Sequence, residues 1–468
     1  MKSEIRPFGI RDKIGYMFGD FGNDFTFIFA SSFLMVFYTK VLNISGAAVG
    51  TLFFIARFVD AATDVTMGRI VDVMKPGKDG RFRCWIRRMC GPVALASFLM
   101  YQSAMADAPM FWRMVYMYVT YLLWGSVFYT SINIPYGSMA SAITADPVER
   151  TSLSAFRNAG AALASLAIGV ITPLVIYTTD DMGNQVVRGG GAFTAIAGVF
   201  SVCAVVCYVI CYKLCTERVK IEKPKNKKRT SVIGSLASLA ANRALWGIIA
   251  AAVFLLLSQL LITSMNNYLY TDYYSNAAAI SAFTLIANLS IILIVSPLSV
   301  RISKRFGKKE SAAAAMFFSG AVYILLYFAR PASVWAFLII SCIGYLGLGF
   351  FNAVIWANIT DVIDYQEIKT RRREDGTIYA VYSFARKLGQ ALAGGAGGWA
   401  LTIIGYDNLA AAQTNYVLTG LYTTATLVPG VCFLIVAAIL AFVYPLGKRR
   451  VEANVAELRR RREAGDPE

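Results

Sequence analysis

The sequence predicts an all-α membrane protein with twelve transmembrane helices in two halves of six. Of the 468 residues, 57% are hydrophobic and 16% are charged, whereas about a quarter of the residues in an ordinary soluble protein are charged. Long apolar runs recur along the whole chain, for example at 244–263 and 428–443. A run of about 20 apolar residues spans a hydrocarbon core about 30 Å thick. A basic linker at 215–243 separates the two sets of runs.

The apolar runs place the individual helices. The first six are expected at 14–42, 47–72, 85–106, 111–141, 151–178 and 191–214. The second six are expected at 244–271, 277–301, 310–329, 333–361, 378–404 and 415–446. The predicted domains are an N-terminal bundle (1–214), a cytoplasmic linker (215–243), a C-terminal bundle (244–446) and a cytoplasmic tail (447–468). A short basic connection follows the second helix of each half, and this weak repeat is typical of transporters.

The distribution of basic residues predicts the orientation in the membrane. The formal net charge is +17, but the predicted external loops hold only Lys40, Arg113, Arg188 and Arg330. The other connections hold basic clusters at 75–88, 213–229, 301–309, 369–373 and 448–462. This asymmetry follows the positive-inside rule and predicts that both termini are cytoplasmic. We therefore expect an integral protein of the plasma (inner) membrane. Its basic residues are expected to contact membrane lipid, and no nucleic-acid partner is expected.

Four of the eight cysteines recur at every fourth residue from Cys203 to Cys215. Such a stripe can bind a metal, but this one lies inside an apolar helix and the chain has no histidine. We predict that these cysteines are small packing residues. No structural disulfide is expected, because no cysteine lies in a predicted external loop.

Charged residues inside the second predicted helix indicate a cation site. A charge within a span costs about 2.5–3.5 kcal/mol, and this helix carries Arg57, Asp60 and Asp64 with Thr63 beside them. Spacings of three and four place all four residues on one helix face. Two such carboxylates repel unless a cation lies between them or one is protonated, which suits Na⁺ or a shared proton. The alternative is a structural pair of Arg57 with one aspartate, which leaves the second aspartate unexplained.

A second set of polar residues indicates a substrate site. The first predicted helix carries Asp20 and Asp24 one turn apart. Carboxylates accept hydrogen bonds from neighbouring hydroxyls, as a hydroxylated substrate requires. For Asp20, pairing with a cation elsewhere in the bundle is an equal alternative. Arg157 and Lys387 supply donors from other helices, and Trp356 lies near the charged end of the tenth helix.

Several motifs resemble the glycoside–pentoside–hexuronide:cation symporters, a family of the major facilitator superfamily. They are Gly-Asp-Phe-Gly-Asn-Asp-Phe at 19–25, Arg57-x-x-Asp60-x-x-Thr63-Asp64 followed by Met67-Gly68, Asn-Ile-Pro-Tyr-Gly at 133–137, Asp-Tyr-x-Glu at 364–367, and Ser-Phe-x-Arg-Lys-Leu-Gly-Gln at 383–390. The resemblance covers nearly the whole chain and implies the major facilitator superfamily fold. It also implies a cation site at Asp60, Thr63, Asp64 and Thr130, with Asp60 and Asp64 as the metal ligands if the ion is Na⁺. The implied substrate site includes Asp20, Asn23, Asp24, Asn133, Arg157, Trp356 and Lys387.

The sequence departs from melibiose permease, a member of that family, at four positions. Asn23 replaces a lysine, Asn133 replaces a sugar-binding aspartate, Gly137 replaces a tryptophan and Thr63 replaces a cation-site asparagine. The changes around the sugar site disfavour a galactoside and favour another glycoside, such as a xyloside or a glucuronide. The change at Thr63 leaves both Na⁺ and H⁺ open.

The resemblance implies a cation-coupled symporter that imports a glycoside, pentoside or hexuronide by alternating access. The expected partner is a small-molecule sugar, and no cofactor is expected besides the coupling cation, Na⁺ or H⁺. The alternative is a sodium-coupled lysolipid symporter of the same superfamily. A membrane sensor or enzyme is more distant, because the chain has no histidine and no recognisable nucleophile–base set. The oligomeric state is left open.

Overall fold

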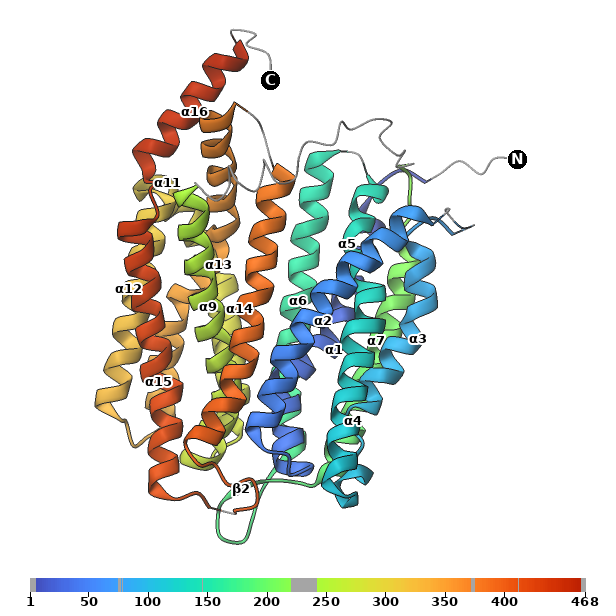
Figure 1. Cartoon of the computed structure of the whole chain (residues 1–468), viewed down its shortest axis with the longest axis vertical. Coiled ribbons are helices and arrows are strands. Elements are labelled where there is room, and N and C mark those ends of the chain that lie inside the picture. Colours follow the sequence, from blue (N-terminus) through green and yellow to red (C-terminus); the bar gives the residue numbers. More distant parts are fainter. Residues whose placement is uncertain are drawn as a thin grey trace. The chain divides into compact units, whose positions relative to one another are not determined.

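The structure, a computed structural model, describes residues 6–463 except 75–76, 78, 145, 220–241, 372–374 and 411. Most of the predicted linker and the basic residues Lys75, Lys78, Arg372 and Arg373 lie outside the described residues. The described secondary structure is almost entirely helical (Figure 1). The predicted all-α class is confirmed.

The chain divides into two compact units. Unit 1 comprises Met1–Pro224, Ser275–Leu285 and Gly398–Gln413, and unit 2 comprises Lys225–Tyr274, Ile286–Gly397 and Thr414–Glu468. Two short segments of the predicted C-terminal bundle therefore belong to unit 1.

The N-terminal part of unit 1 follows the predicted order of helices. Its elements are α1 (Ile10–Val36), η1 (Phe37–Val41), α2 (Gly46–Val73), α3 (Arg83–Leu99), η2 (Ser103–Asp107), α4 (Met110–Leu122), η3 (Leu123–Tyr129), α5 (Thr130–Ile143), α6 (Pro147–Ile176), β1 (Tyr177–Thr179), β2 (Gln185–Val187) and α7 (Gly190–Leu214). The strands β1 and β2 form an antiparallel hairpin between α6 and α7.

Glycines on α1 allow it to pack closely against α7. A Cβ added at Gly15 would lie 2.7 Å from Leu214 Cβ, and one added at Gly19 would lie 2.9 Å from Cys211 Sγ. A Cβ added at Gly22 would lie 3.2 Å from Cys207 Cβ. The cysteine stripe thus packs against the glycines of α1, and close approach of helices through small residues is usual in membranes.

A π-helical segment, η3, joins α4 to α5. Such segments insert an extra residue into a helical turn and often occur at functional sites. The helix predicted at 111–141 is therefore continuous over Met110–Ile143 but changes its winding at Leu123–Tyr129.

Unit 2 contains most of the helices of the second half. The elements from residue 243 onward are α9 (Arg243–Tyr268), η4 (Leu269–Tyr273), α10 (Ala278–Ser290), η5 (Ile291–Val295), α11 (Ser296–Phe306), α12 (Lys308–Ala329), α13 (Val334–Thr370), α14 (Asp375–Ile403), α15 (Asn415–Ala438), η6 (Ile439–Val443) and α16 (Lys448–Glu463). Helices α10 and α14 each have one end in unit 1. The predicted cytoplasmic tail contains the helix α16.

Ten helices in the described part of the chain are long and apolar enough to cross a membrane. The other two predicted spans correspond to Met110–Ile143, which η3 interrupts, and to α14. Each of the twelve predicted runs thus coincides with helical structure.

Within unit 1, the start of α2 meets the end of α14 through backbone atoms. A Cβ added at Gly398 would lie 2.2 Å from the carbonyl oxygen of Gly46. The backbone N–H of Ala47 donates a 2.8 Å hydrogen bond to Thr402 Oγ1. Just beyond these helix ends, Asn408 Nδ2 donates to the carbonyl of Ile44 at 3.1 Å. The hydrogen bonds of this α2–α14 contact join uncharged groups.

Candidate functional site

The two carboxylates of the predicted cation site lie on α2, facing η3 and the start of α5. Both oxygens of Asp60 have partners: Ser126 Oγ donates to Oδ1 at 2.6 Å, and Arg57 Nη1 lies 3.3 Å from Oδ2. The spacing of Arg57 and Asp60 on one helix predicted that this pair was within reach. Ser126 was not predicted as a site residue.

The second carboxylate, Asp64, contacts a threonine at the start of α5. Thr130 Oγ1 lies 2.9 Å from Asp64 Oδ1 and 3.2 Å from the carbonyl oxygen of Gly125. A hydroxyl has one hydrogen, so Thr130 donates to only one of these oxygens at a time. When it donates to Gly125, its lone pairs and the Asp64 carboxylate together present oxygen atoms to a cation.

Thr63 adds a further hydroxyl beside these carboxylates. Its Oγ1 is 3.1 Å from the carbonyl oxygens of both Val59 and Asp60. Because the hydroxyl hydrogen is directed to the backbone of α2, the oxygen retains lone pairs for a ligand. Oxygen donors of this kind suit hard cations. In the part of the chain that the structure describes, no group of three or more His, Cys, Asp or Glu side chains that could hold a metal is present.

On α1, the carboxylate of Asp20 forms a buried ion pair with Arg157 of α6. Arg157 Nε lies 2.9 Å from Asp20 Oδ1, and the side chain of Asp20 is only 8% exposed. The Arg157 side chain is 43% exposed, and its guanidinium carbon lies 5.8 Å from the ring centre of Tyr136. Asp20 therefore orients Arg157 through Nε.

Asp24, one turn after Asp20, is half-buried. No described residue donates a hydrogen bond to it or forms an ion pair with it; Asp20 and Arg157 act on it electrostatically. A carboxylate in this position is an acceptor ready for the hydroxyl groups of a ligand.

The two asparagines that depart from the family pattern are hydrogen-bonded to each other. Asn23 Nδ2 donates to Asn133 Oδ1 at 3.4 Å, and Tyr208 Oη donates to Asn23 Oδ1 at 2.8 Å. These two hydrogen bonds between uncharged side chains link α1, α5 and α7, and we call this set of three side chains the relay. Tyr208 was not predicted as a site residue.

The remaining predicted substrate residues lie in unit 2. Trp356 on α13 is 43% exposed. The Arg386 guanidinium carbon lies 5.3 Å from a Trp356 ring centre, and the Tyr382 ring packs edge-on at 5.5 Å. Lys387 follows Arg386 on α14 and is half-buried. An aromatic ring and basic groups therefore lie together in this unit.

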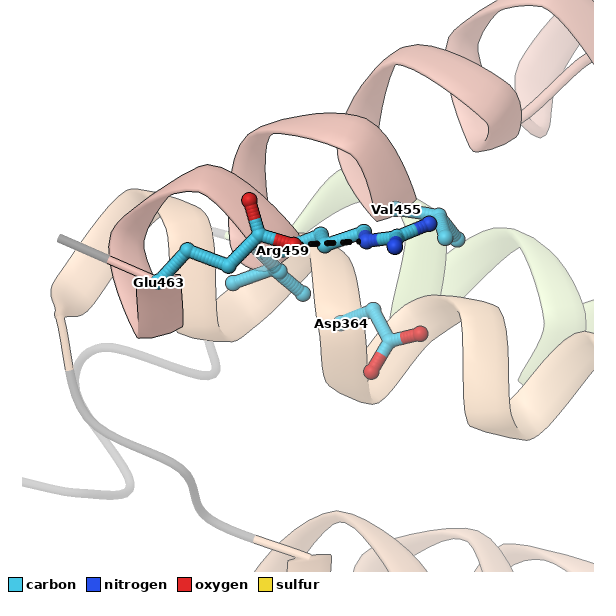
Figure 2. Close-up of a pocket in the computed structure, with 5 residues that line it drawn as sticks. Asp364, Val455, Arg459 and Glu463 are labelled. Carbon is cyan, nitrogen blue, oxygen red and sulfur yellow. Dashed lines mark hydrogen bonds and ion pairs between the residues drawn. The ribbon is translucent and has the colours of Figure 1, made fainter.

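Residues of α13 and α16 in unit 2 line a separate pocket, drawn in Figure 2. Its volume is about 420 Å³. Its lining includes Asp364 and Leu458, and the ion pair of Arg459 with Glu463, at 2.8 Å, lies beside it. None of its lining residues belongs to the predicted site.

Weak sequence signals mark the two residues that were missed. Ser126 lies four positions before Thr130, a spacing that indicates a shared helix face, but serines are common in apolar helices. Tyr208 lies among the cysteines of α7, and nothing in its local sequence distinguishes it from a core tyrosine.

The fold and the polar residues within its spans define a membrane transporter of the major facilitator type. The chain matches the family MFS/sugar transport protein over residues 15–448. It belongs to this family, and therefore to a class of transporters and not of enzymes.

Several named relatives match along almost their whole length. The chain is 30% identical to the glucuronide carrier protein homolog of Escherichia coli (strain K12), covering 97% of this chain and 96% of that protein. It is also 30% identical to a provisionally named sulfoquinovose importer of Salmonella typhimurium, with 98% and 94% covered. A provisionally named glycoside/cation symporter, YagG of Escherichia coli, matches at 30% with 97% and 96% covered.

A solved structure supports the fold. A bacterial homolog of the human lysosomal transporter Spinster superposes with a TM-score of 0.68 at 11% identity, covering 96% of this chain and 99% of that one. The predicted major facilitator superfamily fold is confirmed.

Proposed function

We propose that the protein is a cation-coupled symporter that imports a glycoside, pentoside or hexuronide by alternating access. The observation that carries this proposal is the cluster of oxygen groups around Asp60 and Asp64. Two carboxylates within a span are costly to insert, and hydroxyls from η3 and α5 converge on them. An ion that neutralises this cluster on each transport cycle explains their presence.

The coupling cation, Na⁺ or H⁺, is a transported substrate in this proposal. Asp60, Thr63, Asp64 and Thr130 are its proposed ligands. Sodium requires several oxygens around it, whereas a proton requires a single carboxylate. Replacing Na⁺ by K⁺ at constant pH, and separately imposing a pH gradient without Na⁺, distinguishes the two ions.

The proposed sugar-binding residues are hydrogen-bond acceptors and donors, and each unit carries some of them. Asp24 accepts hydrogen bonds from sugar hydroxyls, while Arg157, positioned by Asp20, donates to sugar oxygens. Asn133 contributes through its amide, which Asn23 orients by a hydrogen bond, and Lys387 and Trp356 are the proposed sugar-binding residues of unit 2. The names of the relatives, which specify a glucuronide, a sulfoquinovose and a glycoside, support a sugar-like substrate.

We further propose that the protein lies in the plasma (inner) membrane with both termini in the cytoplasm. The basic clusters of the connections, set against few basic residues in the external loops, support this orientation. A cation gradient directed inward then drives sugar uptake, with about 2.3 kcal/mol per charge for each 100 mV.

Uptake by vesicles containing the purified protein tests the proposal. The probes are labelled methyl β-D-glucoside, methyl β-D-xyloside and methyl β-D-glucuronide, each offered with an inward Na⁺ gradient or an inward proton gradient. At least one sugar should accumulate above its external concentration under one gradient. Failure of all three to accumulate under either gradient contradicts the proposed function.

The variant Asp24→Ala tests the placement of the sugar site. Because a hydrogen bond to a charged group contributes roughly 1.5–3 kcal/mol, the affinity for the sugar should fall about tenfold to a hundredfold. Affinity for the cation should fall less. Asp180→Ala, in the hairpin between β1 and β2, is the control and should bind like the parent protein. Unchanged sugar binding by purified Asp24→Ala contradicts the assignment.

A further inference from the structure

The hydrogen-bonded relay Tyr208–Asn23–Asn133 has a fixed direction. Tyr208 and Asn23 are each only 1% exposed, so neither exchanges its partner for water. The phenol has a single hydrogen, and the one acceptor that it meets among the described residues is Asn23 Oδ1. Reversing the amide of Asn23 would place an NH₂ group against the phenol and leave the phenolic hydrogen buried without an acceptor, which is unfavourable.

The orientation of the Asn23 amide in turn fixes the orientation of the Asn133 amide. With its oxygen held by Tyr208, Asn23 turns its Nδ2 to Asn133 and donates to Oδ1 of that residue. The oxygen of the Asn133 amide is thereby engaged. Its Nδ2, which carries two hydrogens, has no partner among the described residues, and the side chain is half-buried. The relay therefore leaves Asn133 as a hydrogen-bond donor.

Arg157 supplies donors near Asn133. Arg157 contacts the ring of Tyr136, three residues after Asn133 on α5, which is about one helical turn, or about 5 Å, further along the helix. The Nε of Arg157 is engaged by Asp20, which leaves its terminal nitrogens. This side of unit 1 thus presents donors, and Asp24 supplies the acceptor.

We propose that Tyr208 is a positioning residue that sets Asn133 to donate to a substrate group consisting only of acceptor oxygens, namely the carboxylate of a hexuronide. This inference rests on the proposed function and selects among its substrate classes. Glycosides and pentosides present hydroxyls, which donate as well as accept, whereas a carboxylate only accepts at neutral pH. Donors on Asn133 and Arg157 are complementary to that group, and Asp24 is left for the hydroxyls of the same sugar.

The test compares two ligands that differ at one carbon. Methyl β-D-glucuronide carries a carboxylate where methyl β-D-glucoside carries a hydroxymethyl group. The affinity of the purified protein for each is measured by direct binding, and their ratio is the readout. The parent protein should bind the glucuronide at least about tenfold more tightly, the difference expected for one charge-assisted hydrogen bond.

The variant Tyr208→Phe removes only the phenolic hydroxyl, so Asn23 is free to reverse and the glucuronide preference should fall about tenfold. Tyr101→Phe is the matched control: Tyr101 is also fully buried in unit 1, but its hydroxyl meets no hydrogen-bond partner in the described part of the chain, and its removal should leave the ratio unchanged. An equal loss of both affinities in Tyr208→Phe, as from a merely structural role, overturns the inference, and so does an unchanged ratio.

A second variant keeps the inference testable if Tyr208→Phe does not fold. Asn133→Asp replaces the donor by a carboxylate and should reverse the preference in favour of the glucoside. A retained glucuronide preference in Asn133→Asp overturns the inference. If the parent protein transports the glucoside or the xyloside but not the glucuronide, this inference fails while the proposed function stands. If it transports none of the three, the proposed function itself fails.

Discussion

Two buried threonines of unit 1 have hydroxyls in opposite surroundings. Thr130 Oγ1 lies 2.9 Å from Asp64, whereas Thr172 Oγ1, on α6, has no hydrogen-bond partner among the residues that the structure describes. Substitution by valine keeps the shape of the side chain and removes the hydroxyl. Thr130→Val should raise the cation concentration for half-maximal sugar uptake about tenfold, because one proposed ligand of the cation is lost.

Thr172→Val is the control for Thr130→Val. It removes a buried polar group that has no partner, so it should leave the cation dependence unchanged and be neutral or stabilising. The measurement is sugar uptake at a series of cation concentrations. Equal cation dependence in the two variants would show that the Thr130 hydroxyl is not part of the cation site.

Sequence reasoning succeeded where site residues share one helix. The spacing of Arg57, Asp60 and Asp64 on α2 predicted their common face, and the structure places them there. The sequence predicted fewer of the contacts between different helices. Asp20 and Arg157 are 137 residues apart, and the sequence offered both aspartates of α1 as substrate ligands, with the pairing of Asp20 to a cation elsewhere in the bundle as an equal alternative. The fold distinguishes them, because Asp20 pairs with Arg157 while Asp24 receives no hydrogen bond from a described residue.

At the scale of elements, the α2–α14 contact depends on the absence of side chains. A Cβ at Gly398 would lie 2.2 Å from Gly46 O and 2.7 Å from Gly50 N, both backbone atoms that cannot rotate away. Gly398→Ala should therefore lower the free energy of unfolding by about 1–3 kcal/mol, as overpacking does. Thermal unfolding of the purified protein measures this.

Gly68, within α2, provides the matched comparison for Gly398. Apart from the adjoining backbone of α2, a Cβ added there comes within 4 Å of no atom of the described residues, and alanine is about 1 kcal/mol more favourable than glycine in a helix. Gly68→Ala should thus raise the melting temperature slightly or leave it unchanged. If Gly398→Ala is as stable as Gly68→Ala, the contact between α2 and α14 is looser than described.

The helices were predictable as elements, but their internal irregularities were not. Runs of apolar residues predicted one span over 111–141, yet the π-helical segment η3 lies within it and brings Ser126 to Asp60. A change of winding by one residue leaves hydropathy unaltered, so composition carries no sign of it. The helix α16 was not predicted, because such a highly charged sequence is typical of a tail. In the structure, Leu458, 5% exposed, packs this helix against the rest of unit 2.

At the scale of the whole molecule, the orientation in the membrane is testable with single cysteines. Cys90 and Cys203 are the partly exposed native cysteines, and the other six are buried, so a background with Ser at these two positions suffices. Met182→Cys, in the hairpin, where the native side chain is 81% exposed, should react with a membrane-impermeant maleimide added outside cells. Arg449→Cys, on α16, should react only after the cells are opened.

Reaction of Arg449→Cys in intact cells would reverse the proposed orientation. Reaction of both cysteines from the same side would instead overturn the count of spans between residues 182 and 449. In the first result only Arg449→Cys reacts from outside, so the two positions exchange sides. In the second result both cysteines lie on one side, so the number of spans between them is even.

The all-α membrane class followed from composition, apolar runs and charge asymmetry because each of these responds to the bilayer itself, whereas the superfamily was expected from the resemblance of the motifs to a known family. The division into compact units did not follow. Ser275–Leu285 and Gly398–Gln413 pack with unit 1 although they belong to the second half of the sequence. Contacts such as Gly46 with Gly398 depend on local shape, which hydropathy does not record.

The α2–α14 contact also determines which forces act there. Its close approach joins backbone atoms and its hydrogen bonds join uncharged groups, so its attraction is short-ranged and fades within about 1 Å of separation. Attraction between charges would extend over about 10 Å at moderate ionic strength and respond to salt. These backbone contacts and hydrogen bonds therefore stabilise the contact only when it is fully formed, and they depend little on ionic strength. Ionic strength and membrane voltage act instead on charged groups, such as the carboxylates of the proposed cation site.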